Sequence, residues 1–274
     1  MDIRLICMDL DGTALQKDRN HFSPRLHAAL AEAFHRGIAI APVTGRQYDL
    51  LPQVLKEPQI WEQYAVLCNG AQIRMLRTGE VLQRLDIAPE ALEMLLAVAD
   101  KWDLPIEFSV DSILHLTARA YEQQLPDPKL TFHRDVILAK NGRIVDSLHP
   151  LCSQRVEKVN LIGISPSIRE QVLQDLKQLP VSAVWASSSS MEITHPKATK
   201  AEGLKALCRL LDIPPEQAMA LGDSGNDESI LRLAGLGVAM GNAPENIKAL
   251  ADVVTESNEN DGAAIAIERY ALNQ

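Results

Sequence analysis

Short apolar runs alternate with helical stretches at the two ends of the chain, and this alternation most limits the folds open to it. In the first third the runs cover residues 3–8, 38–41 and 65–68. Between the first two, Ser23-Pro24 is typical of a helix start, with a capping residue followed by proline. Runs that are apolar throughout are typical of strands buried on both faces. The pattern therefore predicts a parallel sheet covered by helices on both sides.

The same alternation returns near the other end, and the residues between differ from it. The late elements are a helix over 200–211, a strand over 218–221, a helix over 228–234 and apolar runs over 236–240 and 252–254. The central part, after a helix-like stretch over 89–102, has mixed polar and aromatic segments with several prolines. We therefore expect a doubly wound, Rossmann-like α/β core from residues 1–84 and 188–274, carrying an inserted α+β domain over 85–187. The serine run 187–190 is either a connector back to the core or a plain loop.

Composition excludes several classes of protein. The 274 residues are 46% hydrophobic and 23% charged, as in an ordinary folded protein. The formal net charge of −9 argues against nucleic-acid binding, which needs a basic face. The four cysteines are far apart, which favours buried reduced thiols. No apolar run is long enough to span a bilayer and the N-terminus lacks a signal-peptide pattern, so we expect a cytoplasmic protein without a membrane partner. The oligomeric state stays open.

Acidic and hydroxyl side chains follow the expected strands, at the sheet edge where ligands bind in such folds. The three segments are Asp9-Leu10-Asp11-Gly12-Thr13, Thr44-Gly45-Arg46 and Gly222-Asp223-Ser224-Gly225-Asn226-Asp227. Carboxylates packed together repel one another, and a hard cation such as Mg²⁺ relieves that repulsion. The spacing of Asp9 and Asp11 suits one nucleophile and one general acid/base. Gly12 allows a tight turn whose amides can donate to phosphate oxygens.

A transferring phosphoryl group also needs donors and positive charge around its oxygens. The Thr44 hydroxyl and the Gly45 amide can donate. Lys200, at the start of a predicted helix, can supply a point charge near the positive end of that helix. These residues favour chemistry on a phosphate ester.

At these motifs the chain resembles the haloacid dehalogenase (HAD) superfamily of aspartate-nucleophile phosphatases, and specifically its Cof-type subfamily IIB with a C2 cap. Further branch-like features are Asn69-Gly70-Ala71, Met240-Gly241-Asn242-Ala243 with Lys248, and Asn260-Asp261-Gly262-Ala263-Ala264. One departure is that Lys197 and Ala201 stand near Lys200 where the branch usually has glycines. The resemblance implies an HAD-like α/β core whose inserted cap domain sets substrate specificity.

The resemblance also implies a role for each motif residue. Asp9 would form an aspartyl-phosphate, and Asp11 would protonate the leaving oxygen and then activate water. Lys200 would bind the phosphoryl group and orient Asp9. The residues expected to contact phosphate or substrate are Leu10, Thr44, Gly45, Asn69 and Asn226. The residues expected to hold Mg²⁺ are Asp9, Asp11 through its backbone carbonyl, Asp223 and Asp227, the last directly or through water.

We therefore expect Mg²⁺-dependent hydrolysis of phosphate monoesters of small metabolites, such as sugar phosphates. One alternative is a phosphomutase, which returns the phosphoryl group to its substrate. Another is a non-catalytic sensor of phosphorylated metabolites, although a pure binder has no need of both nucleophile and acid. Four residues of the insertion are candidates for specificity but are better explained as solvent-facing or core side chains: His115, Arg119, Tyr121 and His133.

Overall fold

The computed structural model describes residues 2–56, 63–124, 139 and 142–273. The chain forms two compact units, each described by itself. The first contains residues 1–44, 51–83 and 199–274, and the second contains residues 45–50 and 84–198. The bounds of these units differ from the expected ones at residues 45–50, 84 and 188–198, which group with the second unit and were expected in the core.

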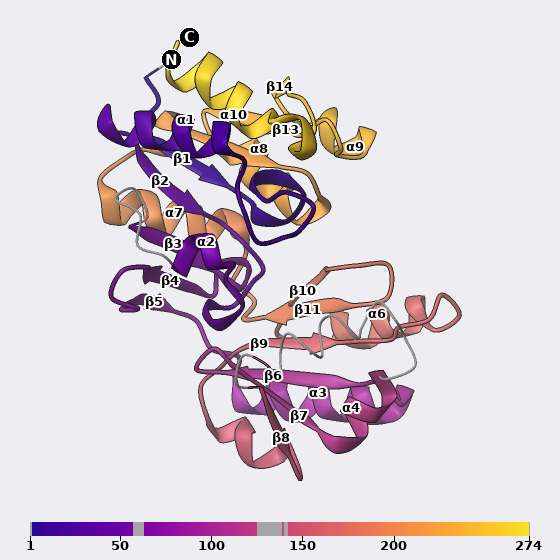
Figure 1. The fold of residues 1–274 in the computed structure, drawn as a ribbon. Coiled ribbons are helices and arrows are strands. Elements are labelled where there is room, and N and C mark those ends of the chain that lie inside the picture. The colour runs from indigo at the N-terminus through magenta and orange to yellow at the C-terminus, as the bar shows by residue number, and fades with distance from the viewer. Residues whose placement is uncertain (1, 57–62, 125–138, 140–141, 274) are drawn as a thin grey trace. The chain divides into compact units, whose positions relative to one another are not determined.

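The first unit contains a five-stranded parallel sheet with the order β14-β13-β12-β1-β2. Its strands are β1 (Leu5–Met8), β2 (Ala39–Pro42), β12 (Ala218–Gly222), β13 (Leu236–Ala239) and β14 (Val253–Val254). Its helices are α1 (Pro24–His35), α2 (Gln53–Lys56), α7 (Lys200–Leu211), α8 (Glu228–Leu233), α9 (Glu245–Lys248) and α10 (Gly262–Ala266). Figure 1 shows α1 and α10 together on one side of the sheet and α7 on the other. The doubly wound α/β fold is confirmed.

Capping residues begin the two long helices of this unit. The Ser23 side chain accepts a hydrogen bond from the Leu26 amide at 3.1 Å, and proline follows at the first position of α1. Thr199 caps α7 in the same way, accepting from the Glu202 amide at 3.1 Å. The buried faces of α7 and α8 pack on side chains of β1, β2 and β12. These contacts anchor the start of α7 beside the sheet.

The apolar run at 65–68 departs from the expected arrangement. It forms β3 (Tyr64–Leu67), which belongs to a separate sheet with β4 (Gln72–Met75) and β5 (Val81–Arg84). A parallel bridge between Val43 and Val66 links β3 to the end of β2. The chain reverses into β4 at a turn where Asn69 has φ of 52°. β5 then lies beside β4 in this sheet, with the Met75 amide donating to the Glu80 carbonyl at 2.9 Å.

The second unit contains a six-stranded sheet with the order β10-β11-β9-β6-β7-β8. Its strands are β6 (Ile106–Val110), β7 (Ile113–Thr117), β8 (Arg143–Val145), β9 (Val156–Leu161), β10 (Ser182–Trp185) and β11 (Met191–Thr194). Its labelled helices are α3 (Pro89–Trp102), α4 (Ala118–Gln124) and α6 (Arg169–Lys177). Apolar side chains of α3, α6 and the sheet share one core. The serine run is the plain loop between the antiparallel strands β10 and β11.

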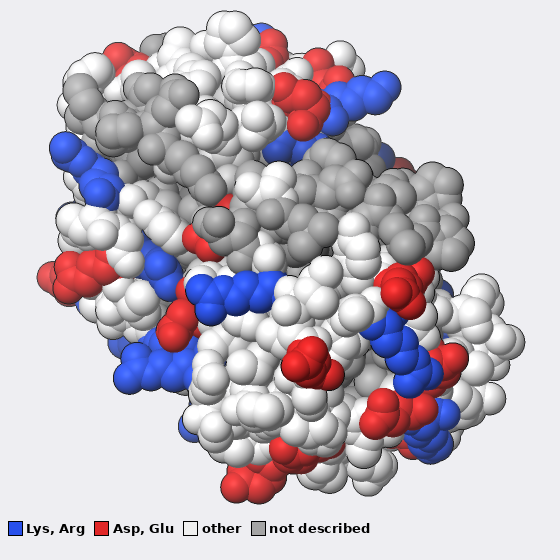
Figure 2. Space-filling model, turned by 60° about the horizontal axis from the view of Figure 1, so that its bottom comes forward, with Lys and Arg blue, Asp and Glu red and all other residues white. Residues whose placement is uncertain are grey.

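Charged side chains of both signs are visible on one face of the molecule. On the face shown in Figure 2, lysine and arginine lie interspersed with aspartate and glutamate. Within the described part of the chain, no helix is both long enough and apolar enough to cross a bilayer.

Candidate active site

Asp9 directly follows β1, and the register of the sheet decides what surrounds it. Met8 pairs with Leu221 of β12, and the Asp9 amide donates to the Leu221 carbonyl at 3.0 Å. Thr44 and Asp223 follow the neighbouring strands β2 and β12, which run parallel to β1. These residues therefore leave adjacent strands at the same edge of the sheet.

Lys200 joins two of the acidic side chains. Its Nζ lies 2.9 Å from Asp9 Oδ1 and 2.6 Å from Asp227 Oδ1. The side chains of Lys200 and Asp227 are completely buried, and that of Asp9 is 7% exposed. A buried charge is tolerated when it is paired and hydrogen-bonded, so the ammonium group fixes the positions of both carboxylates.

Asp223 and Asp227 are held by the turn that follows β12. Asp227 Oδ2 accepts hydrogen bonds from the backbone amides of Asp223 and Ser224, each at 3.0 Å. Asp223 Oδ1 accepts from the Thr13 hydroxyl at 3.0 Å. One carboxylate oxygen from each of Asp9, Asp223 and Asp227 lies within 4.8 Å of the others. We call these three side chains the acidic group.

The acidic group carries more negative charge than its surroundings favour. Burial, with repulsion from Asp227 and Asp223, raises the pKa of Asp9 to about 8 although Lys200 opposes the shift. Burial and the charge of Asp227 likewise raise the pKa of Asp223 to about 6. Burial alone would lower the pKa of Lys200, but Asp227 and Asp9 outweigh it and hold that pKa above its usual value. One lysine thus leaves negative charge that a divalent cation would balance.

Two glycines allow the backbone to approach this group closely. Gly12 has φ of +77°, and a Cβ placed there would lie 2.4 Å from Asp223 Oδ2. A Cβ at Gly222 would lie 2.4 Å from the Asp227 Cβ. Real Cβ atoms do not approach other atoms so closely, so these positions have no room for a side chain. Gly12 thus lets its turn contact Asp223, and Gly222 lets the loop after β12 fold back on itself at Asp227.

The Asp11 side chain pairs with an arginine outside the acidic group, and its charge contributes to raising the pKa of Asp223. It forms an ion pair with Arg19 at 2.9 Å and is 29% exposed. The backbone of Asp11 lies in the tight turn Leu10–Ala14, beside Gly12. No signal in the sequence indicated Arg19 as a partner.

The remaining predicted residues divide between the two units. Thr44 is buried, and its carbonyl accepts from the Asn69 amide at 3.0 Å. The Asn69 side chain accepts from Asn226 Nδ2 at 3.5 Å, so these three residues lie together in the first unit. Gly45 belongs to the second unit, where its carbonyl accepts from Lys158 Nζ at 2.8 Å.

Asn242 stands in one of the branch-like motifs of the sequence but was assigned no role at the site, although it lies beside the acidic group. Asn242 Nδ2 donates to the Gly12 carbonyl at 2.9 Å and lies 3.4 Å from Asp223 Oδ2. Asn242 follows β13, which pairs with β12 in the same parallel sheet. Its position after a strand of this sheet was the signal that could have identified it.

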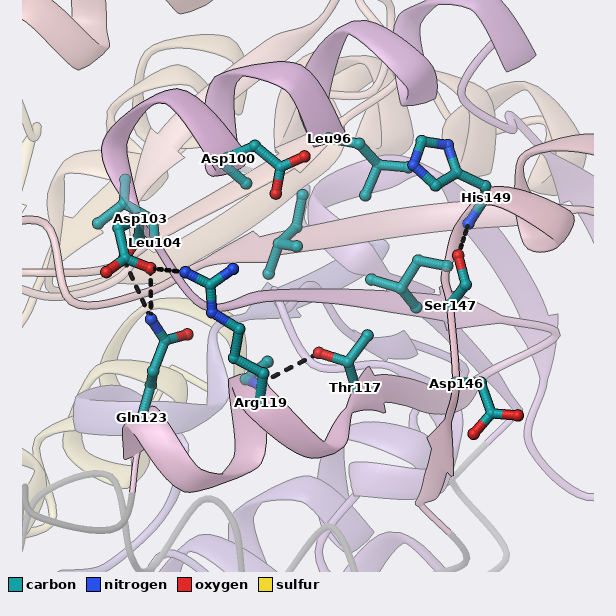
Figure 3. Close-up of a pocket in the computed structure, with 14 residues that line it drawn as sticks. Leu96, Asp100, Asp103, Leu104, Thr117, Arg119, Gln123, Asp146, Ser147 and His149 are labelled. Atoms are coloured by element: carbon teal, nitrogen blue, oxygen red, sulfur yellow. Dashed lines mark hydrogen bonds and ion pairs between the residues drawn. The ribbon is translucent and has the colours of Figure 1, made fainter.

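A cavity of about 260 Å³ lies in the second unit between α3, α4 and residues 146–149. Its rim side chains bind one another: Asp103 pairs with Arg119 and accepts from Gln123 Nε2 at 2.8 Å (Figure 3). Arg119, a specificity candidate from the sequence, therefore has a structural partner. His115 and Tyr121 are not among the residues that line the cavity. His133 lies outside the described residues.

Comparison with known proteins identifies the family. Residues 6–267 match the family model of haloacid dehalogenase-like hydrolases. The chain is 29% identical over 277 residues to the putative phosphatase YxeH of Bacillus subtilis, covering 98% of each chain. It is 28% identical over 273 residues to 5-amino-6-(5-phospho-D-ribitylamino)uracil phosphatase YcsE of B. subtilis, covering 99% of this chain and 97% of that one.

Solved structures agree with this assignment. A haloacid dehalogenase-like hydrolase from B. subtilis has a TM-score of 0.83 and 26% identity, and the match covers 98% of this chain and all of that one. The described geometry, with buried aspartates at the edge of a parallel sheet, fits the same family. The chain belongs to the haloacid dehalogenase superfamily and is a Cof-type phosphatase.

Proposed function

We propose that the protein hydrolyses phosphate monoesters of small metabolites, through an aspartyl-phosphate on Asp9 and with Mg²⁺ as cofactor. The observation that carries the proposal is the contact of Lys200 Nζ with both Asp9 and Asp227 inside the acidic group. Lys200 fixes Asp9 at the sheet edge, and its charge favours the ionised form of Asp9 against the effect of burial. An ionised carboxylate fixed in this way suits nucleophilic attack on phosphorus.

The oxygen-only donor set of the acidic group fits a hard divalent cation. Mg²⁺ would be held by Asp9, Asp223 and the Asp11 backbone carbonyl, and when bound it would neutralise charge on the phosphate. Both oxygens of Asp227 already accept hydrogen bonds, from Lys200 and from two backbone amides. In this proposal Asp227 therefore acts through its charge, or through water.

The reaction has two steps in this proposal. Asp9 attacks phosphorus, the ester P–O bond breaks, and Asp11 gives its proton to the leaving oxygen. Asp11 then takes a proton from water as that water attacks the aspartyl-phosphate, which releases phosphate and restores Asp9. Asp11 must leave its ion pair with Arg19 to carry this proton.

Backbone and side-chain donors would bind the phosphate. We assign this role to the Thr44 hydroxyl, Lys200 and the amides of Leu10 and Gly45, with Asn69 and Asn226 completing the site. The second unit would act as the specificity domain. The relative YcsE is named for a phosphoribityl substrate, so phosphorylated sugars and sugar alcohols are the first class to test.

The test is phosphate release from an aryl phosphate by wild type and Asp9→Asn, each with Mg²⁺ and with a chelator. Asp212→Asn is the matched control, because Asp212 is an exposed residue in a left-handed conformation that asparagine also adopts. We expect metal-dependent release by wild type and Asp212→Asn and none by Asp9→Asn. Equal release by all three proteins would remove Asp9 from the mechanism. Binding without net phosphate release would favour a sensor or a mutase.

A further inference from the structure

The segment that follows Thr44 is bound into the second unit. Thr44 belongs to the first unit, and its backbone bonds to Val66 and Asn69. Residues 45–50, one peptide bond later, belong to the second unit. The chain therefore crosses between the units directly at the residue proposed to donate to phosphate.

Gln47 is the main anchor of this segment. Its side chain is 1% exposed, and both ends of its amide are bonded. Nε2 donates to the Ser112 carbonyl at 2.8 Å, and Oε1 accepts from the Ser109 hydroxyl. Two residues earlier, the Gly45 carbonyl accepts from Lys158 Nζ. A buried amide with matched partners at both ends fixes the backbone that carries it.

Ser112 links Gln47 to residues beside a second point at which the chain passes between the units, residues 83–84. Asp111 and Ser112 form the two-residue turn between β6 and β7, with φ of 49° and 69°. Non-glycine residues adopt this conformation at a cost, so the surroundings must hold the turn. The Ser112 amide donates to Glu157 Oε1, and Glu157 Oε2 accepts from Arg84 Nη2 at 3.1 Å.

A continuous chain of hydrogen bonds thus runs from Gln47 through Ser112 and Glu157 to Arg84. Arg84 is the first residue of the second unit after the crossing at 83–84. Glu157 is completely buried and Arg84 is 13% exposed by side chain. The network therefore joins two of the places where the chain enters this unit.

We propose that Gln47 is a positioning residue: through this network it fixes the peptide that follows Thr44, and so places the Thr44 hydroxyl for phosphoryl transfer. The inference rests on the function proposed above. Loss of the network would leave the acidic group and Lys200 unchanged but would loosen the Thr44–Gly45 peptide. Because a displaced donor weakens transition-state binding more than substrate binding, the effect belongs in kcat rather than in KM.

The first test compares Gln47→Leu with Val172→Ala, using aryl phosphate and Mg²⁺. Val172 is buried in α6 within the core of the same unit and is not part of the network, so its truncation controls for lost stability. We expect kcat to fall about tenfold in Gln47→Leu, with KM and the Mg²⁺ activation midpoint within about twofold of wild type. Val172→Ala should keep the wild-type kcat. Equal kcat values for Gln47→Leu and Val172→Ala would overturn the proposal.

Gln47→Glu gives a signature that lost stability alone would not produce. A protonated glutamic acid can donate to the Ser112 carbonyl and accept from Ser109 as glutamine does, whereas a carboxylate cannot donate. The kcat of the variant relative to wild type should therefore rise as the pH falls from about 8 to about 5.5, because burial raises the pKa of a carboxyl group. A ratio independent of pH would count against the proposed role.

Amide hydrogen exchange tests the network without any turnover. In Gln47→Leu, exchange should accelerate in both 43–50 and 83–88, and it should stay at the wild-type rate in these segments of Val172→Ala. Acceleration confined to 43–50 would show that the two crossings are independent and would refute the network. If wild type hydrolysed no substrate, the proposed function would fail, while this exchange experiment would still decide the network.

Discussion

At the scale of single residues, Lys200 is the one cation in direct contact with the acidic group among the described residues. Its replacement therefore tests how the site is held together. Its ammonium group pairs with both Asp9 and Asp227, and the Lys200 side chain is completely buried. Removing one partner of a buried ion pair leaves charge uncompensated, at a cost of about 3–5 kcal/mol. The stability and the chemistry of the site therefore depend on the same atom.

We predict that Lys200→Met lowers the free energy of unfolding by about 3 kcal/mol and eliminates phosphate release. Lys205→Met is the matched control, because Lys205 lies on the same helix and its ion pair with Glu202 is on the surface. That variant should stay within about 0.5 kcal/mol of wild type. Urea unfolding and phosphate assays measure both effects. Equal stability of the two variants would contradict this view of Lys200.

Gly12→Ala should abolish activity, because the new Cβ would lie 2.4 Å from Asp223 Oδ2. Gly37→Ala is a matched control: Gly37 also has a positive φ, of 81°, but nothing lies within 4 Å of its Cβ position. Both variants should lose about 1 kcal/mol of stability from the strained backbone. Only Gly12→Ala should lose phosphate release, by at least about a hundredfold. Full activity in Gly12→Ala would contradict the close approach of these turns.

Glu157 should make stability depend on pH. Burial is the main cause that raises its pKa from 4.5 to about 7, against the opposing effect of Arg84. Between these values the folded protein holds a proton that the unfolded chain has lost, so stability falls as pH rises through this range. Relative to Glu157→Gln, wild type should lose on the order of 2 kcal/mol between about pH 5 and 8. Urea unfolding at several pH values measures this difference, and parallel curves would contradict it.

At the scale of elements, most strands and helices could be predicted from the sequence, because short stretches of the sequence carry the signals that define them. The N-cap and proline of α1 and the wholly apolar runs of β1 and β12 carry their own signals. The sheet to which β3 belongs could not be predicted from such local signals. The apolar run of β3 is equally compatible with either sheet, and tertiary contacts through Val66 and β4 decide between them.

The candidate site shows the same limit. Asp9, Asp223 and Asp227 could be placed together because each follows a strand or starts a helix, and the order of these motifs along the chain is informative. Arg19 pairs with Asp11 from an exposed turn. An exposed side chain in a turn is not part of any hydrophobic pattern in the sequence, so this pairing could not be predicted. Gln47 was invisible because its role depends on Ser112, 65 residues away in the sequence.

Two helix caps that are chemically alike should have different effects on activity. Thr199→Ala and Ser23→Ala each remove a side chain that accepts from a backbone amide, at a cost of about 1 kcal/mol. Thr199 directly precedes Lys200, so frayed packing at this end of α7 displaces the ammonium group. We expect kcat to fall severalfold in Thr199→Ala and to stay unchanged in Ser23→Ala. Identical kcat values would show that the α7 cap only stabilises the helix.

At the scale of the whole molecule, we expect the acidic group to couple folding to cation binding. Its three aspartates come from segments at opposite ends of the chain, and only the folded state brings them within 4.8 Å. A ligand that binds only the folded state stabilises it by about 2.7 kcal/mol at a hundred times its dissociation constant.

Mg²⁺ should therefore raise the thermal midpoint of wild type, and a chelator should reverse the increase. Asp223→Asn should lose most of this response, whereas Asp212→Asn should retain it because Asp212 is exposed at the end of α7. Thermal unfolding followed by circular dichroism, with and without Mg²⁺, measures the shift. A full response in Asp223→Asn would remove that residue from the cation site.

The strand order of the parallel sheet has a consequence for folding during synthesis. Leu5 of β1 pairs with Ala218 of β12, which lies 213 residues later in the sequence. At a synthesis rate of about 5–20 residues per second, the ribosome needs roughly 10–40 s to add that stretch. Throughout this interval one edge of β1 is unpaired. Contact with a chaperone or with the ribosome surface would keep its apolar side chains from water. Asp9, the nucleophile of the proposed reaction, is thus made early and can act only after β12 has been made.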